Sequence, residues 1–219
     1  MRAASMTAPV SAPADELVPT YPLFLRLAGR RVLVVGAGPV GTGKLAPLRT
    51  AGAQIIVVAP EASAEVCELA ATGAIELRSR PVEAHDLDGA WLVVAAAPPA
   101  VNREVHAWAE ALRVFVLAVD DMGATDAFSP AVLSRGGIRI ALSSEGRAPA
   151  LIGLVREALE HVLPDDAELS TWMGIATAAR EGWKRDGLPL HERRSQLLVR
   201  LLEARTATGL LLDAPRVTP

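Results

Sequence analysis

Three glycines stand at the spacing of a loop that can hold a phosphate. Gly36, Gly38 and Gly41 form the pattern G-x-G-x-x-G directly after the apolar run that begins at Arg31. In such a loop the first glycine permits a tight turn. The second lets backbone N–H groups approach a pyrophosphate, and the third lets a helix pack against the strand. The positive end of that helix would face the phosphates. The pattern predicts dinucleotide binding; the alternative is a packing turn that binds nothing.

A second chemical group is expected where the fifth predicted strand ends. Asp120 follows six apolar residues, and ligands of open parallel sheets bind at the carboxyl ends of the strands. Desolvation at such a position raises the pKa of a carboxyl group, which suits a general acid or base. We therefore take Asp120 as the catalytic candidate. The alternative is a carboxylate that only caps a turn or a helix.

The loop over residues 143–149, called the serine loop below, is a third candidate, because it follows a strand and precedes a helix. Its hydroxyl and backbone N–H groups could bind an anion. Arginines, whose planar forks suit carboxylates, surround it in the sequence: Arg135, Arg139, Arg147 and Arg156. This pattern favours a polycarboxylate substrate. Because the chain has only two lysines, a general preference for arginine on a solvated surface is the alternative.

The end of the second predicted strand decides which nucleotide fits. NAD sites place an acidic residue about twenty residues after the glycines, where it binds the ribose. Here the strand closes on Ala59 and Pro60, the first acid is Glu61, and no arginine stands there to receive a 2′-phosphate. We therefore expect NAD, with Pro60 and Glu61 on the adenosine side. The spacing of His, Cys and acidic residues predicts no metal site.

Strands and helices alternate through the first 120 residues. After the strand at Arg31, strands are predicted at 54–60, 74–80, 90–97 and 114–120, with helices at 39–50, 61–71 and 99–112. This order is typical of an α/β protein with a Rossmann-type, doubly wound parallel sheet. Residues 127–143 predict a hairpin with a Gly-Gly turn, and helices are expected at 148–164, 166–185 and 190–207.

These elements divide the chain into four parts. We expect a disordered tail over 1–20, an NAD-binding Rossmann domain over 21–126, a β extension and dimerisation segment over 127–150, and a helical domain over 151–219. The apolar faces of the helical domain exceed what a short bundle can hide from water. A homodimer is therefore expected.

Composition narrows the range of partners. The net charge of −3 argues against nucleic acid or an anionic membrane as the main partner. Cys67 is the only cysteine, so an intrachain disulfide is impossible and a reducing compartment is the simpler assumption. No apolar run reaches the roughly 18 residues of a membrane span. We expect a cytoplasmic protein.

Several stretches of the chain occur together in one known family. They are YPLFLRLAGRRVLVVGAGPVGTGK, AGAQIIVVAP, the pair Val101-Asn102, LAVDD, AFSPA, SSEGRAPALIGLVREALE and, more loosely, HERR. Together they resemble the precorrin-2 dehydrogenase domain of siroheme synthases, which also occurs as a stand-alone enzyme. The resemblance covers roughly 21–202.

The resemblance implies NAD-dependent oxidation of precorrin-2, a carboxylate-rich tetrapyrrole, to sirohydrochlorin for siroheme or cobalamin synthesis. Asp120 matches the catalytic aspartate of the family, and Ser144 matches a serine of the substrate cleft; we place Asn102 and Arg147 on the substrate side with it. The cofactor side comprises Gly36, Gly38, Pro39, Val40, Gly41, Pro60 and Glu61. The methyltransferase domain of some relatives has no counterpart, so we expect another protein to supply precorrin-2.

Two departures from the family pattern bear on the site. Ala97, Pro98 and Pro99 stand where the family often has Thr-Asp-Asp, which removes polar contacts from that loop. Glu145 replaces a common glycine of the serine loop. It adds a negative charge where a polyanion would dock.

Two other functions fit the same residues. The first is insertion of iron or cobalt into sirohydrochlorin, which makes the metal ion a substrate and requires no NAD; with iron this is a sirohydrochlorin ferrochelatase. The second is a non-catalytic regulatory dimer that binds NAD through the glycine loop alone. Metal insertion assayed without NAD, and cofactor binding without tetrapyrrole affinity, would separate them.

Overall fold

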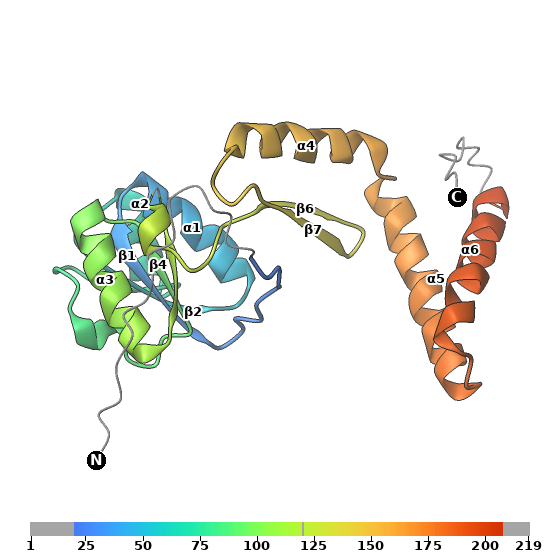
Figure 1. Ribbon diagram of the computed structural model, residues 1–219, viewed down its shortest axis with the longest axis horizontal. Coiled ribbons are helices and arrows are strands. Elements are labelled where there is room, and N and C mark those ends of the chain that lie inside the picture. Colours follow the sequence, from blue (N-terminus) through green and yellow to red (C-terminus); the bar gives the residue numbers. More distant parts are fainter. Residues whose placement is uncertain (1–19, 120, 208–219) are drawn as a thin grey trace, which may run out of the picture.

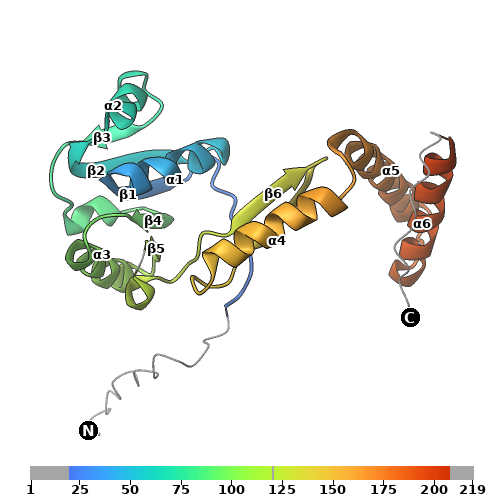
Figure 2. The same ribbon diagram turned by 90° about the horizontal axis from the view of Figure 1, so that it is seen from above.

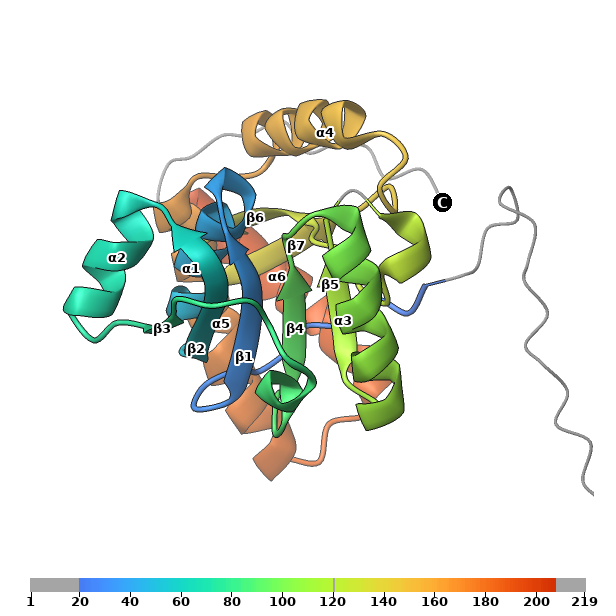
Figure 3. The same cartoon turned by 90° about the vertical axis from the view of Figure 1, so that its left-hand side faces the viewer.

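A five-stranded parallel sheet, with the helices packed on it, forms the larger part of the computed structural model, which describes residues 20–119 and 121–207 (Figure 1). The strand order is β3-β2-β1-β4-β5, so the chain starts in the middle of the sheet and winds outward in both directions. Figure 3 shows the strands side by side. The strands are β1 (Arg31–Ala37), β2 (Gln54–Ala62), β3 (Glu76–Arg78), β4 (Leu92–Ala95) and β5 (Phe115–Ala118). The predicted doubly wound α/β fold is confirmed.

Alternate residues of the central strand β1 pack into two separate hydrophobic cores, one on each face of the sheet. Val32 and Val34 face α1 (Pro39–Thr50) and α2 (Ala64–Ala71), whereas Leu33 and Val35 face α3 (Pro99–Leu112). Successive side chains of a strand point to opposite faces of its sheet. Because both faces of β1 are covered, the strand reads as an unbroken apolar run.

The end of the second strand and the start of the second helix differ from their predicted bounds. The second strand continues to Ala62, which pairs with Ala37 after a register shift in β1. Glu61 therefore lies on a strand and not in a helix, and α2 begins only after Ser63, whose Oγ accepts a hydrogen bond from the Val66 N–H. Between β3 and β4 the chain forms only the short 3-10 helix η1 (Ala84–Leu87). The strict alternation of strand and helix was wrong at this crossover.

A buried carboxylate stabilises the connection between β3 and β4. Asp86 is fully buried, and it accepts hydrogen bonds from Arg80 (2.7 Å), the Glu83 N–H (2.9 Å) and Arg78 (2.7 Å). Burial alone would raise the pKa of this carboxyl group, but these hydrogen bonds outweigh it and hold the pKa well below the usual range. Arg31 also donates to the Asp86 carbonyl, which ties η1 to β1.

Beyond the sheet, a hairpin and a long helix lead to a helical pair. The hairpin joins β6 (Ala131–Arg135) to β7 (Ile138–Leu142) through Gly136 and Gly137, whose φ angles are +54° and +81°. Figure 2 shows α4 (Pro149–Val162) lying along this hairpin. Helices α5 (Asp166–Arg185) and α6 (Leu190–Ala207) form the far end of the molecule (Figure 1). The short helix η2 (Met122–Ala124) follows β5. The predicted hairpin and all three helices are confirmed.

Candidate functional site

The glycine loop joins β1 to α1, and its three glycines have three different surroundings. A Cβ on Gly36, where φ is +100°, would lie 2.3 Å from the Ala96 carbonyl oxygen; one on Gly41 would lie 2.1 Å from the Gly36 oxygen. Both positions therefore exclude any side chain. A Cβ on Gly38 would meet nothing within 4 Å. The middle glycine thus borders open space at the start of α1.

The amino end of α1 is suited to an anion. Gly38 is its N-cap, no side chain caps the helix there, and the first turn holds no acidic residue. The free N–H groups of a first helical turn bind phosphates well. Pro39 and Val40 follow, both exposed, and Val40 leaves 45% of its surface in solvent. The predicted pyrophosphate residues are thus grouped at one accessible helix end.

The end of β2 lies beside this loop. The Ser63 N–H donates to the Ala37 carbonyl (3.2 Å), and the Ser63 hydroxyl lies 3.1 Å from that of Thr42 in α1. These bonds join the carboxyl ends of β1 and β2. Pro60 and Glu61 are exposed at that end. Their placement suits the adenosine side predicted for them.

The Asn102 side chain makes a hydrogen bond within the protein. Its side chain is 1% exposed, and its Oδ1 accepts a hydrogen bond from the Ala97 N–H (3.0 Å). It thereby fixes the turn between β4 and α3, which contains Ala97, Pro98 and Pro99. This oxygen therefore holds the backbone of the turn, and the buried side chain offers almost no surface to a ligand.

The end of β5 carries the predicted catalytic position. Asp120 lies outside the described residues, but both sequence neighbours are placed. The Val119 N–H donates to the Ala95 carbonyl (3.0 Å), which continues the pairing of β5 with β4. On the other side, Asp121 caps η2 by accepting from the Gly123 N–H (3.1 Å).

The serine loop connects β7 to α4. Ser144 Oγ accepts a hydrogen bond from the Ala148 N–H (2.9 Å), and the Arg147 Nε donates to the Ser144 carbonyl (3.1 Å). Ser144 and Arg147 are thus brought together. Glu145 adopts φ +54° and accepts from the Thr20 hydroxyl (2.6 Å). In Figure 3, α4 lies on the side to which the strands of the sheet point.

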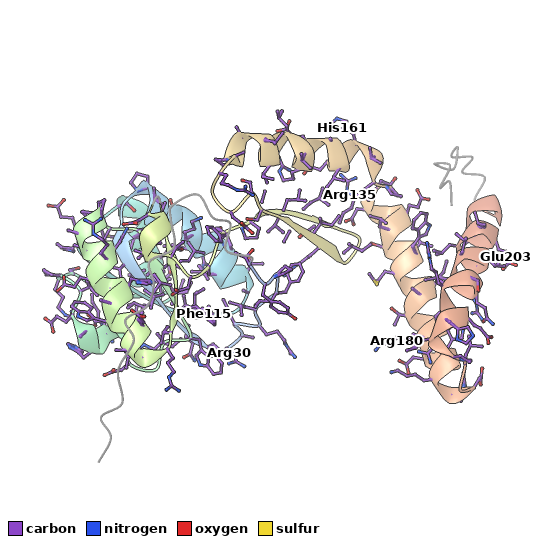
Figure 4. All side chains as sticks on the ribbon, viewed as in Figure 1. Arg30, Phe115, Arg135, His161, Arg180 and Glu203 are labelled. Carbon is purple, nitrogen blue, oxygen red and sulfur yellow. The ribbon has the colours of Figure 1, made fainter. Side chains whose placement is uncertain are left out.

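The four arginines around this loop do not form one patch. The Arg135 Nη1 donates to the carbonyls of Glu160 (2.8 Å), Leu163 and Pro164, where it caps the end of α4 (Figure 4). Arg156 pairs with Glu160. Only Arg139 and Arg147 keep exposed side chains. The prediction that all four arginines are available to a substrate was wrong, because Arg135 binds the carbonyls at the end of α4 and Arg156 pairs with Glu160 of the same helix.

Sequence reasoning missed a group of polar residues on the outer side of β5. Asp126 accepts from the Val116 N–H (2.9 Å), and its other oxygen lies 3.2 Å from His106 of α3. Thr125 Oγ1 accepts from the Ala118 N–H (3.1 Å). His106 and Asp126 are twenty residues apart with β5 between them, so no local pattern signals the pair.

Within residues 20–119 and 121–207, no group of His, Cys, Asp and Glu side chains could hold a metal ion. None of the helices described there is long and apolar enough to cross a membrane.

Comparison with known proteins agrees with this geometry. A family model described as "Putative NAD(P)-binding" matches residues 23–131. The fold and the glycine loop therefore define an NAD(P)-binding protein of the Rossmann class.

Similarity to named proteins shows which family of this class the chain resembles. The chain is 40% identical to siroheme synthase 3 of Aeromonas hydrophila over 79% of its own length, and 37% identical to siroheme synthase of Photorhabdus laumondii over 80%. In both cases it spans 37% of the relative. Its fold matches the solved structure of SirC, a precorrin-2 dehydrogenase, with a TM-score of 0.64 and 27% identity over 82% of this chain and 88% of that one. The chain belongs to the family of precorrin-2 dehydrogenases and the corresponding part of siroheme synthases.

Proposed function

We propose that this chain oxidises precorrin-2 to sirohydrochlorin with NAD, for siroheme or cobalamin synthesis. The observation that carries the proposal is the open face of Gly38 at an uncapped helix end, in a chain similar to SirC over most of its length. A pyrophosphate needs this combination of close backbone approach and free N–H groups.

The cofactor would lie across the carboxyl ends of β1 and β2. Its pyrophosphate would be held by the glycine loop and its adenosine by the end of β2; the residues are Gly36, Gly38, Pro39, Val40, Gly41, Pro60 and Glu61. When bound, the nicotinamide supplies the acceptor for a hydride. The exposed Glu61 carboxylate would repel a 2′-phosphate. Arg78, which lies opposite Val58 where β3 pairs with β2, and Arg80 after it are held by Asp86. Both features favour NAD over NADP.

Asp120 is proposed as the group that takes the proton. Oxidation removes one hydride and one proton from the tetrapyrrole, so a base must stand on the substrate side as the hydride leaves. Ser144 and the exposed Arg147 would bind substrate carboxylates, since hydroxyl and guanidinium groups both donate to them. Asn102 would act on this side through the turn that it holds.

Turnover of precorrin-2 by the purified protein tests the proposal. With NAD present, NADH should appear as precorrin-2 is consumed. Asp120→Ala should lower kcat by roughly 10²–10⁴, the usual contribution of a positioned proton-transfer group, and should leave NAD affinity unchanged. Asp88→Ala, an exposed acid on the β3–β4 connection, is the matched control. Full turnover in Asp120→Ala would refute the proposed role of this residue.

The same assay distinguishes the alternatives. Ferrous or cobalt ions added to sirohydrochlorin without NAD would reveal chelatase activity, with the metal as substrate. NAD binding without any affinity for the tetrapyrrole would instead favour a regulatory protein.

A homodimer is proposed as the functional form. None of the α4 side chains is buried, and Leu151, Leu154 and Val162 expose between 57% and 79% of their surface. An amphipathic helix of this kind gains stability when its apolar face is covered. A monomeric mass by light scattering at micromolar concentration would contradict the proposal.

A further inference from the structure

The segment over residues 20–26, called the arm below, leads towards β1 and exposes large apolar side chains. It belongs to no helix or strand. Tyr21 exposes 85% of its surface, Phe24 65%, Leu23 56% and Leu25 50%. Exposed apolar side chains scattered singly are ordinary, but a contiguous patch of them marks a binding surface. The arm therefore requires an occupant.

Both ends of the arm are attached to the folded protein. At one end the Thr20 hydroxyl donates to Glu145 Oε1 (2.6 Å), a residue 125 positions away in the sequence. At the other end Leu27 is buried in the hydrophobic core, and the Gly29 N–H donates to the Gly52 carbonyl (2.8 Å). The arm is thus held between the serine loop and the start of β1.

The conformation of Glu145 suits this attachment. Its N–H donates to the Ser143 hydroxyl (2.9 Å), and its φ is +54°, which is uncommon for a residue other than glycine. The charge of Glu145 alone would oppose the docking of a polycarboxylate. Its hydrogen bond to Thr20 gives this acid a structural role, because it attaches the arm to the loop that carries Ser144 and the exposed Arg147.

We propose that the arm forms an apolar wall of the tetrapyrrole site and that Glu145 holds this wall in place. A tetrapyrrole combines a flat, largely apolar ring with carboxylates at its rim. The serine loop offers a guanidinium and a hydroxyl to the carboxylates, and the arm offers aromatic side chains to the ring. The proposal rests on the proposed function, because it adds binding residues to the same substrate site.

The affinity of the whole chain for sirohydrochlorin, titrated without NAD and followed by the absorbance of the macrocycle, tests the wall. Phe24→Ser should weaken this affinity about 10- to 100-fold, since covering one aromatic side chain is worth that much. Phe115→Ser is the matched control: Phe115 is exposed to a similar extent, 59%, but begins β5 at the amino end of the strands. It should bind sirohydrochlorin as wild type does. NAD affinity should be unchanged in both variants.

Thr20→Val tests the attachment separately. Valine keeps the size of the side chain and removes the donor, so the affinity for sirohydrochlorin should fall about 2- to 10-fold. Glu145→Gln keeps an acceptor for the Thr20 hydroxyl and removes a negative charge. It should bind sirohydrochlorin at least as tightly as wild type. Thr72→Val, which removes an exposed hydroxyl at the end of α2, is the control and should change nothing.

Proteolysis shows where the ligand lies. Arg26 is exposed within the arm, so trypsin should cleave after it rapidly in the free protein. Saturating sirohydrochlorin should slow this cleavage several-fold, and saturating NAD should not. Mass spectrometry of the fragments follows the cut at this one position.

The outcomes separate the wall from the function on which it rests. Wild-type affinity in Phe24→Ser, an equal loss in Phe115→Ser, or cleavage after Arg26 that sirohydrochlorin leaves unchanged would each overturn the wall. A lower mass of Phe24→Ser by light scattering would assign the arm to a contact between two copies of the chain, and would overturn it too. In these cases a wild-type protein that oxidises precorrin-2 keeps the proposed function intact. A wild-type protein that binds no tetrapyrrole refutes both.

Discussion

Substitution of Gly38 by alanine is the sharpest test of the glycine loop. The backbone of Gly38 has φ −75° and ψ −175°, an extended conformation that any L-residue adopts. The added methyl group would meet no protein atom within 4 Å. The fold should therefore accept the substitution. A pyrophosphate that approaches the backbone at Gly38 should not.

The substitution should change stability little but lower cofactor affinity strongly. Alanine in place of glycine restricts the unfolded chain and stabilises the fold by about 0.4–1 kcal/mol, whereas alanine is a poorer N-cap than glycine by roughly 0.5–1 kcal/mol. Because the two effects nearly cancel, Tm should stay within roughly 2 °C of wild type. Loss of one hydrogen bond to a charged phosphate costs about 1.5–3 kcal/mol. Since each 1.4 kcal/mol is a factor of ten, NAD affinity should fall about 10- to 150-fold.

Calorimetric titration with NAD and a thermal melt of the apoprotein measure the two quantities. Gly43→Ala is the matched control, because Gly43 lies within α1 and also borders open space; it should raise stability by about 1 kcal/mol and leave NAD affinity unchanged. Gly36→Ala should destabilise the fold, since its methyl group would lie 2.3 Å from the Ala96 carbonyl oxygen. It should lower stability by several kcal/mol, on the order of 2–5.

Wild-type NAD affinity in a stable Gly38→Ala protein would refute the reasoning, because the methyl would then stand where no cofactor atom comes. A large fall in Tm for Gly38→Ala, equivalent to the roughly 2–5 kcal/mol expected for Gly36→Ala, would refute the reasoning in another way. It would show that the space beside Gly38 is needed by the fold and is not available to a ligand.

Two further substitutions test the buried acid and the strained loop. Asp86→Asn should lower the free energy of unfolding by about 3–5 kcal/mol at pH 7, because it leaves Arg78 and Arg80 without their charged partner. The folded-state pKa of Asp86 is depressed, so its stabilisation is complete above the unfolded value of about 3.9 and is lost as pH falls below it; denaturant titrations should show the two proteins converging in acid, and a constant difference would contradict this. Glu145→Gly should raise stability by about 1 kcal/mol, since φ +54° favours glycine. Glu145→Gln, which removes only the charge, should show no such gain in a thermal melt.

The sequence by itself determined every element that depends on near neighbours. The apolar run before Gly36 and the glycine spacing predict β1, its loop and α1. Pro99, at the first turn of α3, and the pair Gly136-Gly137 mark their elements in the same way. These features follow from local sterics and from hydrophobic periodicity, so a single stretch of chain contains all the information. The family resemblance rests on stretches of the same local kind.

Tertiary structure alone decided which polar groups meet. Nothing local indicates that Asp86 is buried between two arginines, that Arg135 caps the far end of α4, or that His106 reaches Asp126. β2 likewise extends to Ala62 because Ala37 lies beside it. A side chain's partner is set by how whole elements pack, and packing depends on burial summed over the entire sheet. Residue type and spacing therefore predict what chemistry is possible, while the folded chain determines which donors remain free to perform it.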